Sequence, residues 1–196
     1  MAYAKRLSIA LRAQQWPDHR YQVHMLPRLT LVLGGARSGK SRFAEDLVAK
    51  APPPWLYIAT AEALDDEMRS RIAGHSRRRG SPWSTVEAPL DLAQTIMHNG
   101  SVRGAVLVEC LTLWLSNIQL AGRPLEAETE KLLAALGEAK GPLVAVSNEV
   151  GLGIVPDNRL AREFRDAQGR LNARVAAIAD HVVFLAAGLP LTLKQT

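Results

Sequence analysis

The chain has 196 residues, of which 47% are apolar and 22% are charged, and its formal net charge is +5. A chain of this length can form one domain with a hydrophobic core, and its composition excludes disorder along its whole length. The positive excess suits a polyanionic partner such as a nucleotide. Nucleic acid is not an expected partner, because no continuous basic tract is interleaved with aromatic residues.

The predicted elements form one α/β domain over residues 28–196, preceded by an N-terminal extension, residues 1–27, to which no role is assigned. Short apolar runs alternate with longer amphipathic segments, and strands separated by helices imply βαβ units and a mainly parallel sheet. In chain order we expect a strand at 29–33, a helix at 40–50, a strand at 55–59, helices at 65–79 and 89–98, a strand at 102–109, helices at 111–121 and 125–139, a strand at 143–147, a helix at 158–179, a strand at 182–186 and an edge strand at 189–193.

The cysteine content and the apolar runs bear on where the protein works. Cys110 is the only cysteine, so an intramolecular disulfide and a cysteine zinc cage are impossible, which is typical of a reducing, cytoplasmic location. Because Cys110 follows a predicted buried strand, we interpret it as a small core residue rather than a nucleophile. The nearly uncharged run 105–122 contains Glu109 and Asn117, so a strand followed by a helix explains it better than a membrane span.

A phosphate-binding loop lies between the first predicted strand and the first predicted helix. Gly34, Gly39, Lys40 and Ser41 fit the pattern G-x-x-x-x-G-K-[ST] without a mismatch, and Gly35, Ala36, Arg37 and Ser38 complete the loop. The glycines let the backbone turn tightly and direct N–H groups at phosphate oxygens, while the lysine adds a positive charge. The loop therefore predicts binding of ATP or GTP, with the helix N-terminus facing the phosphates.

A nucleotide site of this kind usually uses Mg²⁺, held by the loop hydroxyl and by a carboxylate at the end of a neighbouring strand. Ser41 supplies the hydroxyl. Glu109 ends the predicted strand 102–109 and is the first candidate for the carboxylate, while Glu149, just after the strand 143–147, is the competing candidate.

A histidine surrounded by arginines lies in the predicted helix 65–79. This segment contains His75 and five arginines, three of them consecutive at Arg77, Arg78 and Arg79. Arginines bind phosphate through paired hydrogen bonds, and a neutral imidazole can attack phosphorus. By composition alone a solvated basic helix explains the segment more simply, and only the arginines distinguish His75 from His98 and His181.

Several segments together resemble one enzyme family in order and spacing. They are GGARSGKS, LYIATAEALDDEM, RIAGHSRRR, WSTVE, LVECLTLWLSN, SNEVGLGIVPDNRLAREFRDAQGRLN and AGLPLTLK. The family is the bifunctional adenosylcobinamide kinase/adenosylcobinamide-phosphate guanylyltransferase of cobalamin synthesis, and the resemblance covers about residues 29–194. It implies a three-layer, RecA-like P-loop fold with a mainly parallel sheet and an antiparallel edge strand.

The resemblance also implies a reaction, substrates and site residues. The enzyme would phosphorylate adenosylcobinamide with ATP or GTP, then transfer GMP from GTP to that phosphate through a GMP-histidine intermediate, giving adenosyl-GDP-cobinamide. The position of that histidine is His75, and members are commonly homotrimeric. The nucleotide-binding positions that carry over are Gly34, Gly35, Ala36, Arg37, Ser38, Gly39, Lys40, Ser41, Ala59, Thr60, Ala61, Ser76, Arg77, Arg78, Arg79, Glu87 and Glu109.

Two other functions fit part of the sequence. A P-loop ATPase or GTPase switch that binds a protein or nucleic acid would explain the loop and the basic charge, but it gives no purpose to His75 or to residues 148–172. A single-activity kinase for another small alcohol would also use the loop. The arginines at 159, 162, 165 and 170 are compatible with a solvated helix face, a subunit interface or contacts to a corrinoid phosphate.

Overall fold

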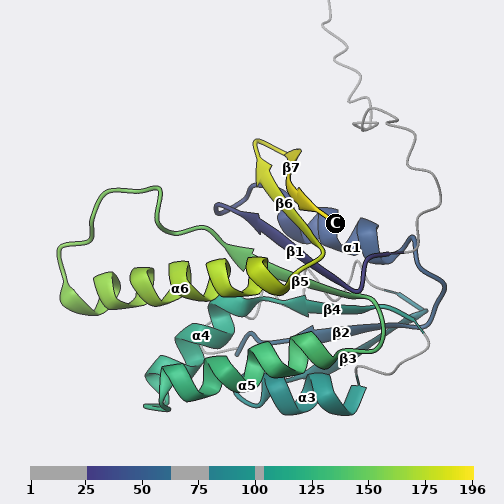
Figure 1. Ribbon diagram of the computed structural model, residues 1–196, viewed down its shortest axis with the longest axis horizontal. Helices are drawn as coiled ribbons and strands as arrows, with labels where there is room; N and C mark the ends of the chain where they lie inside the picture. The colour runs from purple at the N-terminus through teal and green to yellow at the C-terminus, as the bar shows by residue number, and fades with distance from the viewer. Residues whose placement is uncertain (1–25, 63–79, 100–103) are drawn as a thin grey trace, which may run out of the picture.

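The computed structural model describes residues 26–62, 80–99 and 104–196, and their strands form one seven-stranded sheet in the order β3-β2-β4-β5-β1-β6-β7 (Figure 1). The strands are β1 Leu29–Gly34, β2 Trp55–Ala59, β3 Trp83–Glu87, β4 Val106–Glu109, β5 Leu143–Asn148, β6 His181–Ala186 and β7 Leu189–Gln195. Neighbouring strands are parallel except β6 and β7, which pair antiparallel. The prediction of an α/β fold with an antiparallel edge strand is confirmed.

Helices cover both faces of the sheet and make it the middle of three layers (Figure 1). The described helices are α1 Lys40–Val48, α3 Leu92–Asn99, α4 Leu111–Leu120, α5 Leu125–Glu138 and α6 Arg159–Ile178. Ala44 and Val48 of α1 pack with Val144 and Val146 of β5 in one cluster of buried residues. The larger cluster, on the other face, holds residues of α3, α4, α5 and α6. Because both faces are covered, the central strands are apolar along their length rather than alternating with polar residues.

Side-chain hydrogen bonds fasten the amino edge of the sheet, opposite the loop that follows β1. The Arg28 guanidinium donates to the carbonyl oxygens of Leu136 at 3.1 Å and Ile178 at 3.2 Å, near the ends of α5 and α6. The Asp180 carboxylate accepts a hydrogen bond from the Leu29 amide at 3.0 Å. These contacts fix the starts of β1 and β6 and leave the carboxyl edge available for a site.

The predicted and observed elements differ at several places. The strand β3 was not predicted, because it lies at the edge of the sheet and its Ser84 and Thr85 are exposed, so the apolar signal of a buried strand is missing. β4 begins at Val106 rather than 102, and α1 ends at Val48 rather than 50. The predicted helix 65–79 lies outside the described residues.

Candidate functional site

The carboxyl ends of the parallel strands bring the predicted site residues to one edge of the sheet, where open α/β folds bind their ligands. In the strand register, Ala59 at the end of β2 lies beside both Glu87 of β3 and Glu109 of β4. Gly34 at the end of β1 lies beside Asn148 of β5. β5 lies between β4 and β1. Asn148 therefore lies between the end of β4, which carries Glu109, and the end of β1, from which the phosphate loop begins.

The loop 34–41 is held closely against the β6–β7 hairpin. A Cβ added at Gly34 would lie 2.7 Å from the backbone oxygen of Leu185 in β6, so only glycine fits there without a shift. Gly39 has φ 94°, a left-handed conformation that favours glycine. The Ser38 carbonyl accepts a hydrogen bond at 3.1 Å from the amide of Gly188, which lies in the turn between β6 and β7. These contacts hold the loop against the β6–β7 hairpin.

The polar groups of this loop suit a phosphate chain. Lys40 is buried at the first position of α1, and its Nζ donates to the Gly35 carbonyl oxygen at 2.9 Å. The Ser38 Oγ is buried and has no hydrogen-bond partner within the described part of the chain. The N-terminal end of α1 adds its unpaired N–H groups and its positive dipole. A buried cation, an open hydroxyl and a helix N-terminus at one loop fit the oxygens of a phosphate group.

Ser41 and Glu109 form the pair that fits a metal ion. The Ser41 Oγ donates to Glu109 Oε1 at 2.8 Å, across 68 residues of sequence. A hydroxyl and a carboxylate beside a phosphate loop are the oxygen ligands with which Mg²⁺ is held in nucleotide enzymes. Glu149, the competing candidate, instead accepts a hydrogen bond from the Gly151 amide at 2.5 Å. The geometry favours Glu109 over Glu149 for the metal.

Thr60 is a buried residue that supports the backbone at this edge of the sheet. Its side chain is fully buried, and its Oγ1 accepts from the Cys110 amide at 2.7 Å and donates to the Cys110 carbonyl at 2.8 Å. The Thr60 amide donates to the Glu109 carbonyl at 3.0 Å. Thr60 thus fixes the backbone that carries Glu109, and its hydroxyl is already used.

Cys110 is a core residue, as the sequence indicates. It is buried beneath α1, and burial together with the nearby negative charge of Glu109 raises the pKa of its thiol to about 11. The thiol is therefore protonated at neutral pH, which is unsuited to a nucleophile.

The remaining predicted residues fall into two groups. Ala59 and Ala61 are half-buried, and Glu87 is exposed at the end of β3. The second group lies outside the described residues and consists of His75, Ser76, Arg77, Arg78 and Arg79.

The two competing histidines are placed away from the loop. His181 begins β6 beside Thr30, near the start of β1, and His98 lies in the last turn of α3, which precedes β4.

A buried polar cluster at the end of β5 was missed by the sequence prediction. The Ser147 Oγ at the end of β5 donates to Asn172 Oδ1 at 2.7 Å and accepts from Gln168 Nε2 at 3.0 Å. Both α6 residues, Gln168 and Asn172, are buried. The signal was available: Gln168 and Asn172 are four residues apart and lie beside the apolar positions Leu171 and Val175 on the same helix face.

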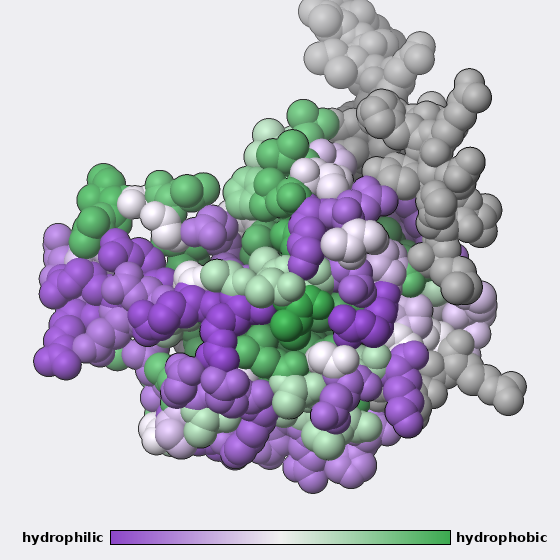
Figure 2. Space-filling model, viewed as in Figure 1, coloured by the Kyte–Doolittle hydropathy of each residue, from purple (hydrophilic) through white to green (hydrophobic). Residues whose placement is uncertain are grey.

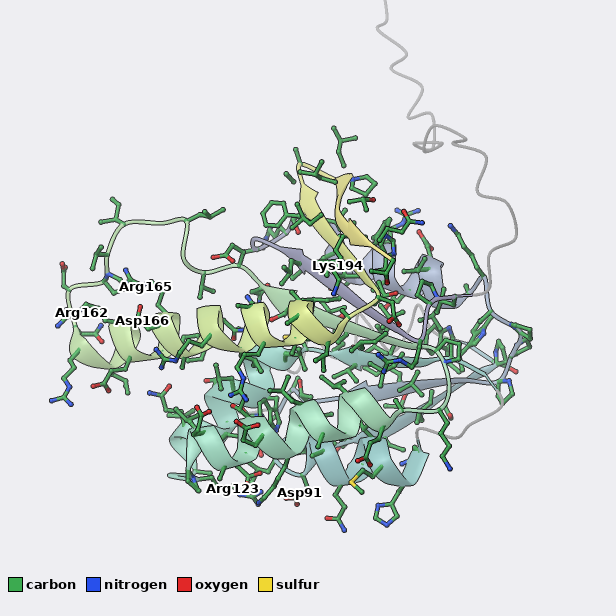
Figure 3. The ribbon with its side chains drawn as sticks, in the orientation of Figure 1. Asp91, Arg123, Arg162, Arg165, Asp166 and Lys194 are labelled. Atoms are coloured by element: carbon green, nitrogen blue, oxygen red, sulfur yellow. The ribbon has the colours of Figure 1, made fainter. Side chains whose placement is uncertain are left out.

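The segment between β5 and α6 arches away from the sheet and is apolar at its tip (Figures 1 and 2). Leu152 is 82% exposed and Ile154 is 97% exposed. Arg162, on the first turns of α6, donates to the carbonyl oxygens of Pro156 at 2.9 Å and Asp157 at 2.7 Å and so ties this arch to the helix (Figure 3).

The fold and the loop define a P-loop nucleotide-binding protein of the α/β class. The flagellar accessory protein FlaH from Methanocaldococcus jannaschii has the same fold, with a TM-score of 0.52 and 10% sequence identity over 91% of this chain and 84% of that chain.

The family is narrower than the fold. The model of the family described as cobinamide kinase / cobinamide phosphate guanyltransferase matches residues 30–193, and the chain belongs to this family. The chain is 49% identical to the bifunctional adenosylcobalamin biosynthesis protein CobP of Pseudomonas aeruginosa, over 84% of this chain and 96% of the relative. It is 42% identical to the corresponding protein CobU of Salmonella typhimurium, over 85% of this chain and 99% of the relative. None of the described helices is long and apolar enough to cross a bilayer.

Proposed function

We propose that the protein phosphorylates the aminopropanol hydroxyl of adenosylcobinamide with ATP or GTP, and then transfers GMP from GTP to that phosphate. The products of the second step are adenosyl-GDP-cobinamide and pyrophosphate. The observation that carries the proposal is the contact of Ser41 with Glu109 at a phosphate loop, in a chain of the cobinamide kinase family.

The phosphoryl-transfer step uses the loop 34–41. Lys40 has the position from which an ammonium group contacts the β and γ phosphates, and the loop amides bind the remaining oxygens. Ser41 and Glu109 would hold Mg²⁺, which supplies charge neutralisation at the phosphate oxygens. Lys40 is already buried and hydrogen-bonded within the loop, so its charge needs little rearrangement to meet the phosphates.

The guanylyl-transfer step is assigned to His75. Its ring nitrogen would attack the α-phosphorus of GTP, forming a P–N bond while the bond to the pyrophosphate leaving group breaks. An oxygen of adenosylcobinamide phosphate would then attack the same phosphorus and release the histidine. Arg77, Arg78 and Arg79 would balance the charge that develops on the phosphate oxygens.

The remaining assignments follow the family resemblance. GTP contacts are proposed for Ala59, Ala61, Ser76 and Glu87. Thr60 would act on the GTP site indirectly, because its amide holds the Glu109 carbonyl. We further propose a homotrimer, whose subunit edges help to build the site, and a cytoplasmic location.

The test of the two-step scheme uses GTP labelled at the α-phosphate. His75→Ala should fail to retain label after denaturation and should still phosphorylate adenosylcobinamide with ATP. His98→Ala, which changes a histidine on the exposed end of α3, is the matched control and should retain the label. Label on the denatured His75→Ala protein would refute the assignment of that residue.

The same assay separates the other functions. A P-loop switch would hydrolyse or exchange nucleotide without modifying the corrinoid, and a single-activity kinase would give adenosylcobinamide phosphate without the GDP derivative. Mass analysis of protein and product after incubation with adenosylcobinamide, ATP and GTP distinguishes all three.

The metal assignment has its own matched pair. Glu109→Gln keeps the shape of the side chain but removes its charge, and it should raise the Mg²⁺ concentration needed for half-maximal kinase activity by at least tenfold, since one of a few anionic ligands is lost. Glu149→Gln should leave that concentration within about twofold. If Glu149→Gln raised that concentration tenfold and Glu109→Gln left it unchanged, the metal would be assigned to Glu149.

A further inference from the structure

The end of β5 is fixed by side chains from two helices on the other face of the sheet. The Asn148 amide donates to Thr112 Oγ1 of α4 at 2.8 Å, and the Asn148 carbonyl accepts from Asn172 Nδ2 of α6 at 3.0 Å. Both of these side chains are buried. The peptide groups on either side of the Asn148 Cα are therefore held, which limits the positions that its own side chain can take.

The direction of the Asn148 side chain follows from the pleat of β5. Val144 and Val146 pack on the α1 face, and residues two apart on a strand share a face. Ser147, on the opposite face, contacts Asn172 of α6, which agrees with this alternation. Asn148 thus projects to the α1 face, where the phosphate loop lies, and it is half-buried there.

The surroundings of Asn148 on this face are those of a triphosphate site. Gly34, the first residue of the loop, is its register partner on β1, and the Glu149 amide donates to the Gly34 carbonyl at 3.0 Å. Glu109 ends the strand on the other side of β5 and is on the same face, since its carboxylate accepts from Ser41 at the start of α1. Within the described part of the chain, the Asn148 carboxamide makes no hydrogen bond of its own.

We propose that the Asn148 carboxamide donates a hydrogen bond to the terminal phosphate of the bound nucleotide, and that Thr112 and Asn172 position it for this contact. The inference rests on the proposed function, because it needs a nucleotide in the loop. In P-loop enzymes the metal ions bridge the β and γ phosphate oxygens, so the γ phosphate lies between the loop and the metal carboxylate. The strand between β1, which leads into the loop, and β4, which carries the metal carboxylate, is β5, and its last residue is Asn148.

Asn148 would thus distinguish a nucleoside triphosphate from a diphosphate. A donor lost from a preorganised site should lower kcat of the kinase step by roughly 10²-fold, with a small change in KM for the corrinoid. Binding of a non-hydrolysable ATP analogue with a γ phosphate should weaken by roughly ten- to hundredfold in Asn148→Ala, as for one hydrogen bond to a charged group, and ADP binding should change by less than about twofold.

Two matched pairs sharpen the test. Asn148→Asp places a negative charge at the same point, so it should weaken the ATP analogue more than Asn148→Ala does. Asn99→Asp adds the same charge at the end of α3, away from the loop, and should weaken neither nucleotide. Thr112→Val removes the hydroxyl that holds the Asn148 amide, so it should weaken binding of the ATP analogue but not of ADP. Thr112→Ser keeps the hydroxyl, so it should bind the analogue as tightly as the unchanged protein does.

Isothermal titration of the ATP analogue and ADP, with a thermal-unfolding scan of each variant, decides between the outcomes. Equal weakening of both nucleotides, or no weakening of either by Asn148→Ala, would overturn the γ-phosphate contact while leaving the kinase assignment intact. A native protein that binds neither nucleotide would overturn the proposed function, and this inference with it. Loss of analogue binding that Thr112→Ser fails to restore would remove Thr112 from the positioning role.

Discussion

Alanine at Gly34 tests how closely the phosphate loop is packed on the sheet. The added Cβ would lie 2.7 Å from the backbone oxygen of Leu185 and 2.5 Å from the Ser38 Oγ. The Ser38 side chain can rotate, but the Leu185 oxygen belongs to β6, which pairs with β1 at this point. The two strands must therefore separate by several tenths of an ångström, against the hydrogen bonds that join them.

The expected magnitude is that of an overpacked core position, a loss of about 1–3 kcal/mol in the free energy of unfolding. For a chain of this size, each kcal/mol lowers Tm by roughly 2–4 °C. Gly35→Ala is the matched control, because a Cβ there meets no atom within 4 Å, and its free energy of unfolding should change by less than about 0.5 kcal/mol.

Urea unfolding without nucleotide, followed by tryptophan fluorescence, measures both variants by linear extrapolation. Omitting nucleotide separates the packing effect from any effect on phosphate binding. The close-packing argument fails if the two alanine variants have the same urea midpoint, since only one of them introduces a clash.

Two further predictions concern the core. Leu115→Ala should lower the free energy of unfolding by about 2–5 kcal/mol, whereas Leu120→Ala on the same helix should change it by less than about 0.5 kcal/mol, because their side chains are 1% and 72% exposed; equal urea midpoints would contradict the placement of α4. Burial raises the pKa of Cys110 from 9.0 to about 11, so the unfolded chain loses its thiol proton first and stability should fall as pH rises from 9 to 11. The loss should reach about 3 kcal/mol, and Cys110→Ala, measured over the same pH series, should lack this part of the decline.

The central elements were predictable because their signals are local. β1 and β5 are mainly apolar and buried, and the loop motif and the first helix follow β1 directly. The edge strand β3 was not predictable in this way, since half of an edge strand faces solvent and polar residues such as Ser84 and Thr85 are tolerated there. Its pairing with β2 is a long-range contact that no local pattern encodes.

The site shows the same division. Lys40 and Ser41 could be chosen as candidates from the motif, and Glu109 from its place at a strand end, and the structure brings Ser41 and Glu109 into contact. The hydrogen bonds that hold the Asn148 backbone could not be predicted from the sequence. Their side chains, Thr112 and Asn172, are 36 and 24 residues away from Asn148, and each has the local pattern of an ordinary polar helix position. Only the packing of α4 and α6 on the same face of the sheet brings them together.

The cluster around Ser147 consists of hydroxyl and carboxamide groups from Thr112, Ser147, Gln168 and Asn172, which carry no net charge and neither gain nor lose a proton at cellular pH. Acidity and ionic strength therefore leave this scaffold unaltered, in contrast to a scaffold made of ion pairs, which salt would weaken. A pH optimum of the enzyme must arise from other ionising groups, and the alignment of the β5 tip should persist across the whole range in which the chain stays folded.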